Sequence, residues 1–205
     1  MTRTLITVPM KDPSTSKTRL SGALDDTARI RLARLLFQRT LEFLTPVGDQ
    51  AGADLAVVTG SDTVTALACQ AGFSVIAEPD HTTLTGAVTH AAEWARAQGY
   101  DRICIIPADL AAPLQRDVLI FLSSDADVTI CPSTDRGTNA LLVSPATAIP
   151  FRFGPRSALL HRAEAEALGL DVRLMPLDSL SFDIDTTACL TRAATQVPDL
   201  AGFAP

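Results

Sequence analysis

The sequence predicts an α/β fold with a doubly wound, mainly parallel sheet that is covered by helices on both faces. Two observations predict it. Short aliphatic runs alternate with stretches of helical spacing along the 205 residues, and 47% of the residues are hydrophobic, enough for a sizeable core. In addition, no Pro-, Gly- or Ser-rich linker divides the chain. We therefore expect a single domain that spans residues 1–205.

Seven short runs of β-branched and aliphatic residues predict strands, most of them buried. These runs are residues 4–8, 55–59, 73–77, 102–106, 127–131, 140–144 and 172–175. Six stretches with helical spacing predict helices, several of them introduced by Asp, Ser or Thr caps: 26–44, 62–71, 84–98, 115–122, 156–168 and 186–196. In such folds the crossovers are right-handed and ligands bind beyond the carboxyl ends of the strands.

Composition excludes several classes of function. The formal net charge is −6, from 17 Lys and Arg against 23 Asp and Glu, which argues against a nucleic-acid-binding surface. No apolar run approaches the roughly 18 to 20 residues of a membrane span. We expect a soluble, cytoplasmic protein without a membrane partner, and apolar helix faces leave room for a homodimer. The four cysteines lack CxxC spacing and the three histidines are isolated, which argues against a zinc site.

A basic loop follows the first predicted strand. Residues 8–20 contain Lys11, Lys17 and Arg19 together with four hydroxyl side chains. Lys11 and Lys17 are the only lysines of the chain. Closely spaced cations can neutralise a polyphosphate, while hydroxyl and backbone N–H groups complete the site. The alternative is a solvated surface loop, because the segment has neither the GxxxxGK[ST] nor the GxGxxG spacing.

Carboxylates stand at two further strand ends. Asp109 follows the run 102–106, and Asp183 and Asp185 come just before the last predicted helix. In an extended segment a spacing of two puts both side chains on the same side, where they can share a cation with Asp109. Mg²⁺ prefers such oxygen ligands. In the alternative interpretation Asp109 is a turn or cap residue, Asp185 caps the last helix and Asp183 forms a turn.

A third polar feature begins at the turn 136–139, which contains Thr138 and leads into an apolar strand. Downstream, Gly154 and Pro155 open a helix whose first turn offers free N–H groups and the Ser157 hydroxyl, with two arginines nearby. This arrangement suits a small phosphorylated acid. The alternative is a Gly-Pro helix start with a serine near the cap and solvated arginines.

Six segments occur in a characteristic order along nearly the whole chain. They are Val8-Pro9-Met10-Lys11, Lys17-Thr18-Arg19-Leu20, Pro107-Ala108-Asp109-Leu110, Gly137-Thr138-Asn139-Ala140-Leu141, Phe151-Arg152-Phe153-Gly154-Pro155-Arg156-Ser157 and Asp183-Ile184-Asp185-Thr186. In this order they resemble the 2-phospho-L-lactate guanylyltransferase family of coenzyme F-420 biosynthesis. The Thr-Asn-Ala-Leu and Phe-Gly-x-x-Ser segments are the more specific ones.

The resemblance implies a nucleotidyltransferase variant of the Rossmann-like fold, of the nucleotide-diphospho-sugar transferase type. It implies transfer of GMP from GTP to a phosphorylated three-carbon acid, with release of pyrophosphate and with Mg²⁺ as cofactor. The implied GTP-phosphate ligands are Lys11, Lys17 and Arg19, and the implied magnesium ligands are Asp109, Asp183 and Asp185. The acid would meet Thr138, Gly154 and Ser157. Among these residues, the expected catalytic ones are Lys17, Arg19 and Asp109.

The sequence departs from the family at two places. Many relatives have Gly-Leu-Asn before the third helix, where this chain reads Thr83-Leu84-Thr85, so Thr85 offers the nucleotide a hydroxyl in place of an amide. The usual Asp-Leu-Pro-Leu after the metal strand is replaced by Asp-Leu-Ala-Ala-Pro at residues 109–113. The acceptor implied by the family is 2-phospho-L-lactate, phosphoenolpyruvate or 3-phospho-D-glycerate.

Other functions fit the sequence less well. A molybdopterin or sugar-phosphate nucleotidyltransferase of the same fold typically has a GGxSxRMG loop, which is absent between Val8 and Leu20. A non-catalytic nucleotide-binding module remains an alternative and predicts GTP binding without magnesium dependence or pyrophosphate formation. A nicotinamide oxidoreductase is disfavoured because no GxGxxG follows the first strand.

Overall fold

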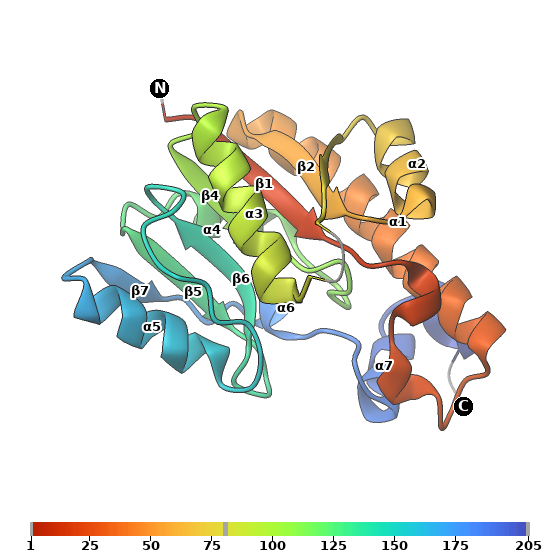
Figure 1. The fold of residues 1–205 in the computed structure, drawn as a ribbon. Coiled ribbons are helices and arrows are strands. Elements are labelled where there is room, and N and C mark those ends of the chain that lie inside the picture. The colour runs from red at the N-terminus through yellow and green to blue at the C-terminus, as the bar shows by residue number, and fades with distance from the viewer. Residues whose placement is uncertain (1, 80–81, 204–205) are drawn as a thin grey trace.

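The computed structural model describes residues 2–79 and 82–203, which form one seven-stranded sheet with helices on both faces (Figure 1). The strand order is β3-β2-β1-β4-β6-β5-β7. The strands are β1 Thr4–Pro9, β2 Asp54–Thr59, β3 Ser74–Ala77, β4 Arg102–Ile105, β5 Val128–Pro132, β6 Thr138–Val143 and β7 Val172–Leu174. All seven predicted strands are therefore confirmed, with small differences at their ends.

Strand β6 is the one strand that runs against its neighbours. It pairs antiparallel with both β4 and β5, whereas β1 pairs parallel with β2 and β4, and β5 pairs parallel with β7. The sheet is thus mixed and mainly parallel, as predicted. Because β6 is reversed, its first residues lie near the carboxyl end of β4, where ligands bind in this class of sheet.

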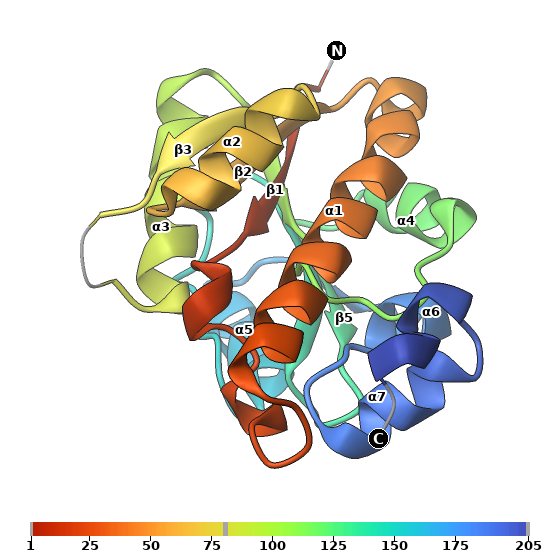
Figure 2. The same cartoon turned by 90° about the vertical axis from the view of Figure 1, so that its right-hand side faces the viewer.

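The helices are α1 Asp26–Ala51, α2 Asp62–Gln70, α3 Leu84–Ala97, α4 Gln115–Leu122, α5 Ser157–Ala167, α6 Asp178–Ser181 and α7 Thr187–Ala194. Helices α3 and α5 cover one face of the sheet. Helices α1, α2 and α4 cover the other face, where α1 crosses the sheet diagonally (Figure 2). Apolar side chains from both layers bury the inner strands β1, β4, β5 and β6 almost completely, whereas the edge strands β3 and β7 stay partly exposed.

Several short elements escape the sequence pattern. Helix α6 and the 3-10 helices η1 Pro13–Thr15, η2 Thr18–Leu20 and η3 Pro198–Phe203 are too short to show a hydrophobic period.

Helix α1 continues past the predicted end at residue 44, through Pro46. Pro46 is exposed, so the carbonyl that loses its N–H partner can bind water, while Leu44 and Val47 remain buried on the opposite side. Packing therefore outweighs the local cost of the proline. Among the described helices, none has both the length and the apolar character needed to cross a membrane.

Candidate functional site

The basic loop after β1 is held in place by two side chains. The carboxylate of Asp12 caps η1 by accepting a hydrogen bond from the Ser14 amide at 2.9 Å. From helix α1, the guanidinium of Arg29 donates to the Ser14 carbonyl at 3.1 Å and to the Ser16 carbonyl. Arg29 is almost fully buried. The loop is therefore an anchored structure, although several of its side chains, Lys11 and Arg19 among them, are exposed to solvent as in the alternative interpretation.

A short antiparallel bridge brings the distant carboxylates together. After β4, Leu110 pairs with Asp183, and the Ile184 amide donates to the Asp109 carbonyl at 3.0 Å. This pairing aligns the turn that carries Asp109 with the extended segment that carries Asp183 and Asp185. One carboxylate oxygen from each of these three residues lies within 4.8 Å of the other two. The convergence expected from the sequence is present.

The capping interpretation of these residues is wrong. Helix α7 is capped by Thr186, whose hydroxyl accepts from the Cys189 amide at 3.2 Å, and not by Asp185. Helix α4 begins after Leu114 without a side-chain cap, so Asp109 does not serve it. The Asp109 backbone does lie in a turn, but its carboxylate has other partners.

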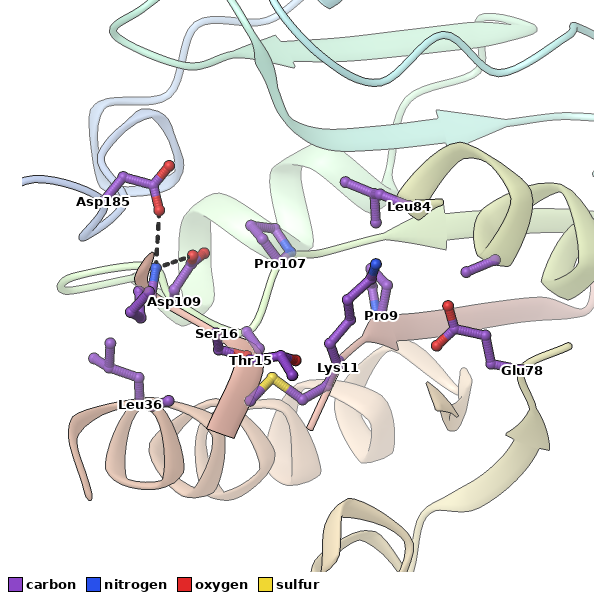
Figure 3. Close-up of a pocket in the computed structure, with 15 residues that line it drawn as sticks. Pro9, Lys11, Thr15, Ser16, Leu36, Glu78, Leu84, Pro107, Asp109 and Asp185 are labelled. Carbon is purple, nitrogen blue, oxygen red and sulfur yellow. Dashed lines mark hydrogen bonds and ion pairs between the residues drawn. The ribbon is translucent and has the colours of Figure 1, made fainter. Parts of the chain in front are cut away.

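Lys17 occupies the centre of the acidic cluster. Its ammonium Nζ lies 3.0 Å from Asp185 Oδ1 and forms a second ion pair with Asp109, contacts marked by the dashed lines in Figure 3. The Lys17 side chain is only 7% exposed. Burial by itself lowers the pKa of Lys17, but the two carboxylates outweigh this effect and the net pKa is raised. Lys17 is therefore a charged group inside the cluster at neutral pH.

Arg19 and Asp183 complete the cluster. Arg19 Nη1 lies 3.4 Å from Asp185 Oδ2, and the arginine side chain is 68% exposed and free to meet a ligand. Burial, with the neighbouring charge of Asp109, raises the pKa of Asp183 to about 6, although the Asn139 amide opposes this by donating a hydrogen bond at 3.1 Å. Burial is the larger cause of this raised pKa, whereas the surplus of negative charge follows from three carboxylates that face two cations, Lys17 and Arg19. An all-oxygen donor set with surplus negative charge suits a hard divalent cation such as Mg²⁺.

A cavity of about 280 Å³ extends from this cluster along the end of the sheet. Its wall is formed by Pro9, Met10, Lys11, Thr15, Ser16, Lys17, Ala33, Leu36, Glu78, Leu84, Ala87, Pro107, Ala108, Asp109 and Asp185. Figure 3 shows Asp109 and Asp185 on one side of the cavity and Lys11 and Glu78 on the other. Two of the three predicted phosphate ligands, Lys11 and Lys17, therefore line one cavity. The third, Arg19, forms an ion pair with Asp185, which belongs to the wall of that cavity.

Thr85 lies next to this cavity and not in its wall. Its hydroxyl accepts a hydrogen bond from the Phe153 amide at 3.2 Å and so joins the first turn of α3 to the loop before α5. The cap of α3 is Thr83, which accepts from the Gly86 amide. The nucleotide contact expected of Thr85 stays a prediction.

The three predicted acid-binding residues contact one another, and none of them belongs to the wall of that cavity. Ser157 Oγ donates to Thr138 Oγ1 at 3.0 Å, and the Ser157 amide donates to the Gly154 carbonyl at 3.1 Å. Ser157 is only 1% exposed, whereas Thr138 is half-buried. Thr138 is therefore the hydroxyl that a ligand can reach, and Ser157 supports it from behind.

The arginines near this group lie on the surface. Arg152 and Arg156 are exposed, and Arg152 Nε pairs with Glu164 at 2.8 Å. In this respect the helix start agrees with the surface interpretation. Arg156 adopts a left-handed backbone with φ of 59° directly before α5, and no side chain caps that helix. The first-turn N–H groups expected to serve an anion are largely engaged by the backbone, because Ser157 donates to the Gly154 carbonyl and Leu159 and Leu160 donate to the Arg156 carbonyl.

Sequence reasoning missed two residues that support the site. Asn139 stands beside Thr138 in β6, and alternation along a strand turns neighbouring side chains to opposite faces, so Asn139 meets Asp183 while Thr138 faces α5. The strand pattern could have indicated this. Nothing in the sequence distinguishes Arg29 from the other arginines of α1, because its partners lie 13 and 15 positions away in an irregular loop.

Comparison with known proteins identifies the family of the chain. The family model described as "Guanylyl transferase CofC like" matches residues 4–193. The chain is 38% identical over 187 residues to a 3-phospho-D-glycerate guanylyltransferase of Colwellia psychrerythraea, covering 90% of this chain and 88% of the relative. It is 32% identical over 192 residues to a phosphoenolpyruvate guanylyltransferase of Chloroflexus aggregans, covering 88% and 91%.

Solved structures support the fold. A crystal structure described as a putative nucleotide-diphospho-sugar transferase of Desulfovibrio desulfuricans superposes with a TM-score of 0.77 at 21% identity, covering 93% of this chain and 86% of the other. The predicted fold class is therefore confirmed. The family match and the guanylyltransferase relatives also decide against the non-catalytic alternative. The chain is a nucleotidyltransferase that belongs to the guanylyl transferase CofC-like family.

Proposed function

We propose that this protein transfers GMP from GTP to a phosphorylated three-carbon acid and releases pyrophosphate. The observation that carries the proposal is the cluster of Lys17 with three convergent carboxylates at one end of a cavity lined by loops at the carboxyl edge of the sheet. Cations and carboxylates together suit a metal-bound triphosphate, because the cations pair with phosphate oxygens and the carboxylates with the metal. Membership of the guanylyltransferase family supports GTP as the nucleotide.

Asp109, Asp183 and Asp185 would hold Mg²⁺, because they offer oxygen ligands within 4.8 Å of one another. Bound there, Mg²⁺ would neutralise charge on the triphosphate. The chain's own cations serve the same end. Lys17 is placed for the phosphates nearest the carboxylates, Arg19 approaches from the exposed side, and Lys11 lies at the far wall of the cavity.

In the proposed reaction a phosphate oxygen of the acid attacks the α-phosphorus of GTP. The bond from that phosphorus to the oxygen bridging to the β-phosphorus breaks, and pyrophosphate leaves. The nucleophile is already anionic, so no general base is needed. The enzyme's contribution is to align the two phosphates and to balance their charge, which Lys17 and Arg19 do from one side. The Thr138 hydroxyl holds the acid from the other side by donating to one of its oxygens.

The expected acceptor is 3-phospho-D-glycerate, because the relative at 38% identity carries that substrate in its name. Phosphoenolpyruvate and 2-phospho-L-lactate share a carboxylate and a phosphate on three carbons with it. They differ in the position of the phosphate and in the presence of a hydroxyl or double bond, which one or two side chains can sense.

The test is release of pyrophosphate from GTP, with each of the three acids offered separately and with ATP and CTP as nucleotide controls. Each reaction is run with Mg²⁺ and again with a chelator. Release that needs GTP, one acid and Mg²⁺ is the expected result and names the acceptor. Folded protein that binds GTP but releases no pyrophosphate with any of the acids would overturn the proposal.

A further inference from the structure

His161 lies buried behind the proposed acid site, and each of its ring nitrogens takes part in a hydrogen bond. It stands on helix α5, one turn after Ser157, and is 0% exposed. Its Nε2 lies 2.8 Å from the Arg152 amide nitrogen, and its Nδ1 lies 3.1 Å from Thr138 Oγ1. Phe151 and Phe153 pack edge-on against the ring, with centroids 6.5 Å and 5.0 Å from it. The ring thus connects β6, α5 and the loop between them.

The hydrogen bonds determine which nitrogen carries the proton. A backbone N–H can only donate, so Nε2 must accept from the Arg152 amide and is unprotonated. Burial lowers the pKa of His161 to about 4, so the ring is neutral at pH 7. A neutral imidazole carries one proton, which must then be on Nδ1. His161 therefore donates from Nδ1 to Thr138 Oγ1.

The same reasoning directs the hydroxyl of Thr138. Its oxygen accepts from His161 Nδ1 and from Ser157 Oγ, which is 3.0 Å away, and these two bonds fill both lone pairs. The proton of Thr138 must then point away from both donors. Thr138 is half-buried whereas Ser157 and His161 are buried, so a ligand on the exposed side of Thr138 can accept that proton.

We infer that His161 is a positioning residue for acid recognition: its Nδ1–H orients the Thr138 hydroxyl so that Thr138 donates to an anionic oxygen of the acid. This inference rests on the proposed function, in which Thr138 binds the acid. Through the Arg152 amide, His161 also fixes the loop that carries Gly154. It makes no contact with the acid itself.

Two conservative variants separate the two bonds of the ring. In His161→Asn the side-chain amide reaches the position of Nδ1 and can still donate to Thr138. In His161→Gln the amide oxygen reaches the position of Nε2, so the bond from Arg152 is kept and the donor to Thr138 is lost. Each variant loses one hydrogen bond, and a merely structural role for His161 would affect them alike. His90→Asn, on α3 and half-buried, is the matched control.

The readout is the KM for the acid against the KM for GTP, measured with the full chain by pyrophosphate release. We expect His161→Gln to raise the acid KM about tenfold, the size of one lost hydrogen bond, with the GTP KM unchanged. His161→Asn should stay within about threefold of the wild type. An unchanged acid KM in His161→Gln, or an equal rise in both KM values, would overturn the inference.

Thr138→Val distinguishes failure of this inference from failure of the proposed site. If Thr138→Val leaves the acid KM unchanged, the acid does not bind at Thr138, and the proposed site fails together with the inference. If Thr138→Val raises the acid KM and His161→Gln does not, only the role of His161 is overturned. In the Thr138→Val background, His161→Gln should have no further effect on the acid KM.

Nitrogen NMR of the wild-type protein tests the inference without any variant. We expect His161 to carry its proton on Nδ1, and the Nδ1–H resonance to shift when 3-phospho-D-glycerate is added but not when GTP is added alone. A proton on Nε2, or an Nδ1–H resonance that does not shift at a saturating concentration of the acid, would overturn the inference. This holds even if every variant failed to fold.

Discussion

The ammonium of Lys17 lies 3.0 Å from the carboxylate of Asp185, although 168 positions separate the two residues. The same ammonium pairs with Asp109, so one buried cation holds two of the three carboxylates that converge at the end of the sheet. The remaining carboxylate, Asp183, is held by Asn139. The charge balance in this cluster determines how the protein responds to substitution, metal and pH.

Replacing Asp109 by Asn should lower turnover by at least about 100-fold, because the variant loses one proposed metal ligand and one partner of Lys17. The fold should survive, since Lys17 keeps Asp185. Pyrophosphate release and thermal unfolding measure the two effects. The matched control is Asp125→Asn, whose side chain is 88% exposed in a surface ion pair with Arg173 and should change neither. Normal turnover in Asp109→Asn would exclude a metal role for this residue.

Replacing Lys17 by Met should separate metal binding from catalysis. The ammonium competes with a metal for the same carboxylates, so its removal should tighten Mg²⁺ binding to the nucleotide-free protein by about tenfold while turnover falls by at least about 100-fold. Isothermal titration calorimetry with Mg²⁺ measures the first effect. Lys11→Met is the control for the metal titration alone and should leave Mg²⁺ affinity unchanged, because the Lys11 Nζ donates to the Thr82 carbonyl outside the cluster. Weaker Mg²⁺ binding in Lys17→Met would show that the lysine assists the metal site.

Metal binding should release a proton in mildly acidic solution. The pKa of Asp183 is raised to about 6, and a metal ligand must be ionised, so Mg²⁺ displaces the proton from the fraction protonated below that pH. Affinity should fall by up to about tenfold per pH unit below pH 6. Calorimetry in two buffers of different ionisation enthalpy, at about pH 5.5 and about pH 7.5, detects the proton. Identical enthalpies in both buffers at the lower pH would contradict this.

The metal-free protein should become more stable when Asp183 is neutralised. The folded pKa of about 6 exceeds the ordinary value of 3.8, so this group adds stability as pH falls from about 6 toward 3.8 and costs stability above pH 6. Asp183→Asn should therefore raise the Tm of the metal-free protein by a few degrees at about pH 7.5, with a smaller gain at about pH 4.5. A lower Tm at the higher pH would show that Asp183 is better accommodated as a carboxylate.

Replacing Arg29 by Met should loosen the basic loop. The variant loses the hydrogen bonds to the Ser14 and Ser16 carbonyls, and we expect a decrease of about 1–3 kcal/mol in the free energy of unfolding. The GTP KM should rise more than the acid KM, because the loop carries Lys11 and Lys17. Denaturant titration and steady-state kinetics measure both. Arg31→Met is the control, because Arg31 is exposed on α1 and its guanidinium lies over the Phe203 ring, away from the basic loop. Equal changes in both KM values would indicate a global effect.

Most of the fold could be predicted because hydrophobic periodicity is a local property of the chain. The seven strands and the six longer helices follow from residues within one element, and the predicted Gln115–Leu122 helix agrees at both ends. The same pattern could not predict α6, because its four residues are too few to show helical periodicity. It also could not predict that α1 continues through Pro46, where burial of the opposite side of the helix outweighs the helix-breaking effect of the proline.

The sequence by itself determined which chemistry the site contains: cations after β1, a carboxylate after β4 and a carboxylate pair before the last helix, all at the ends of predicted elements. Only the tertiary structure decided how these groups are paired. The Leu110–Asp183 bridge, the burial of Lys17 between two carboxylates and the enclosure of Ser157 and His161 behind Thr138 join segments far apart along the chain. Such contacts depend on the path of the whole backbone and on desolvation, and neither property is carried by the local spacing of residue types.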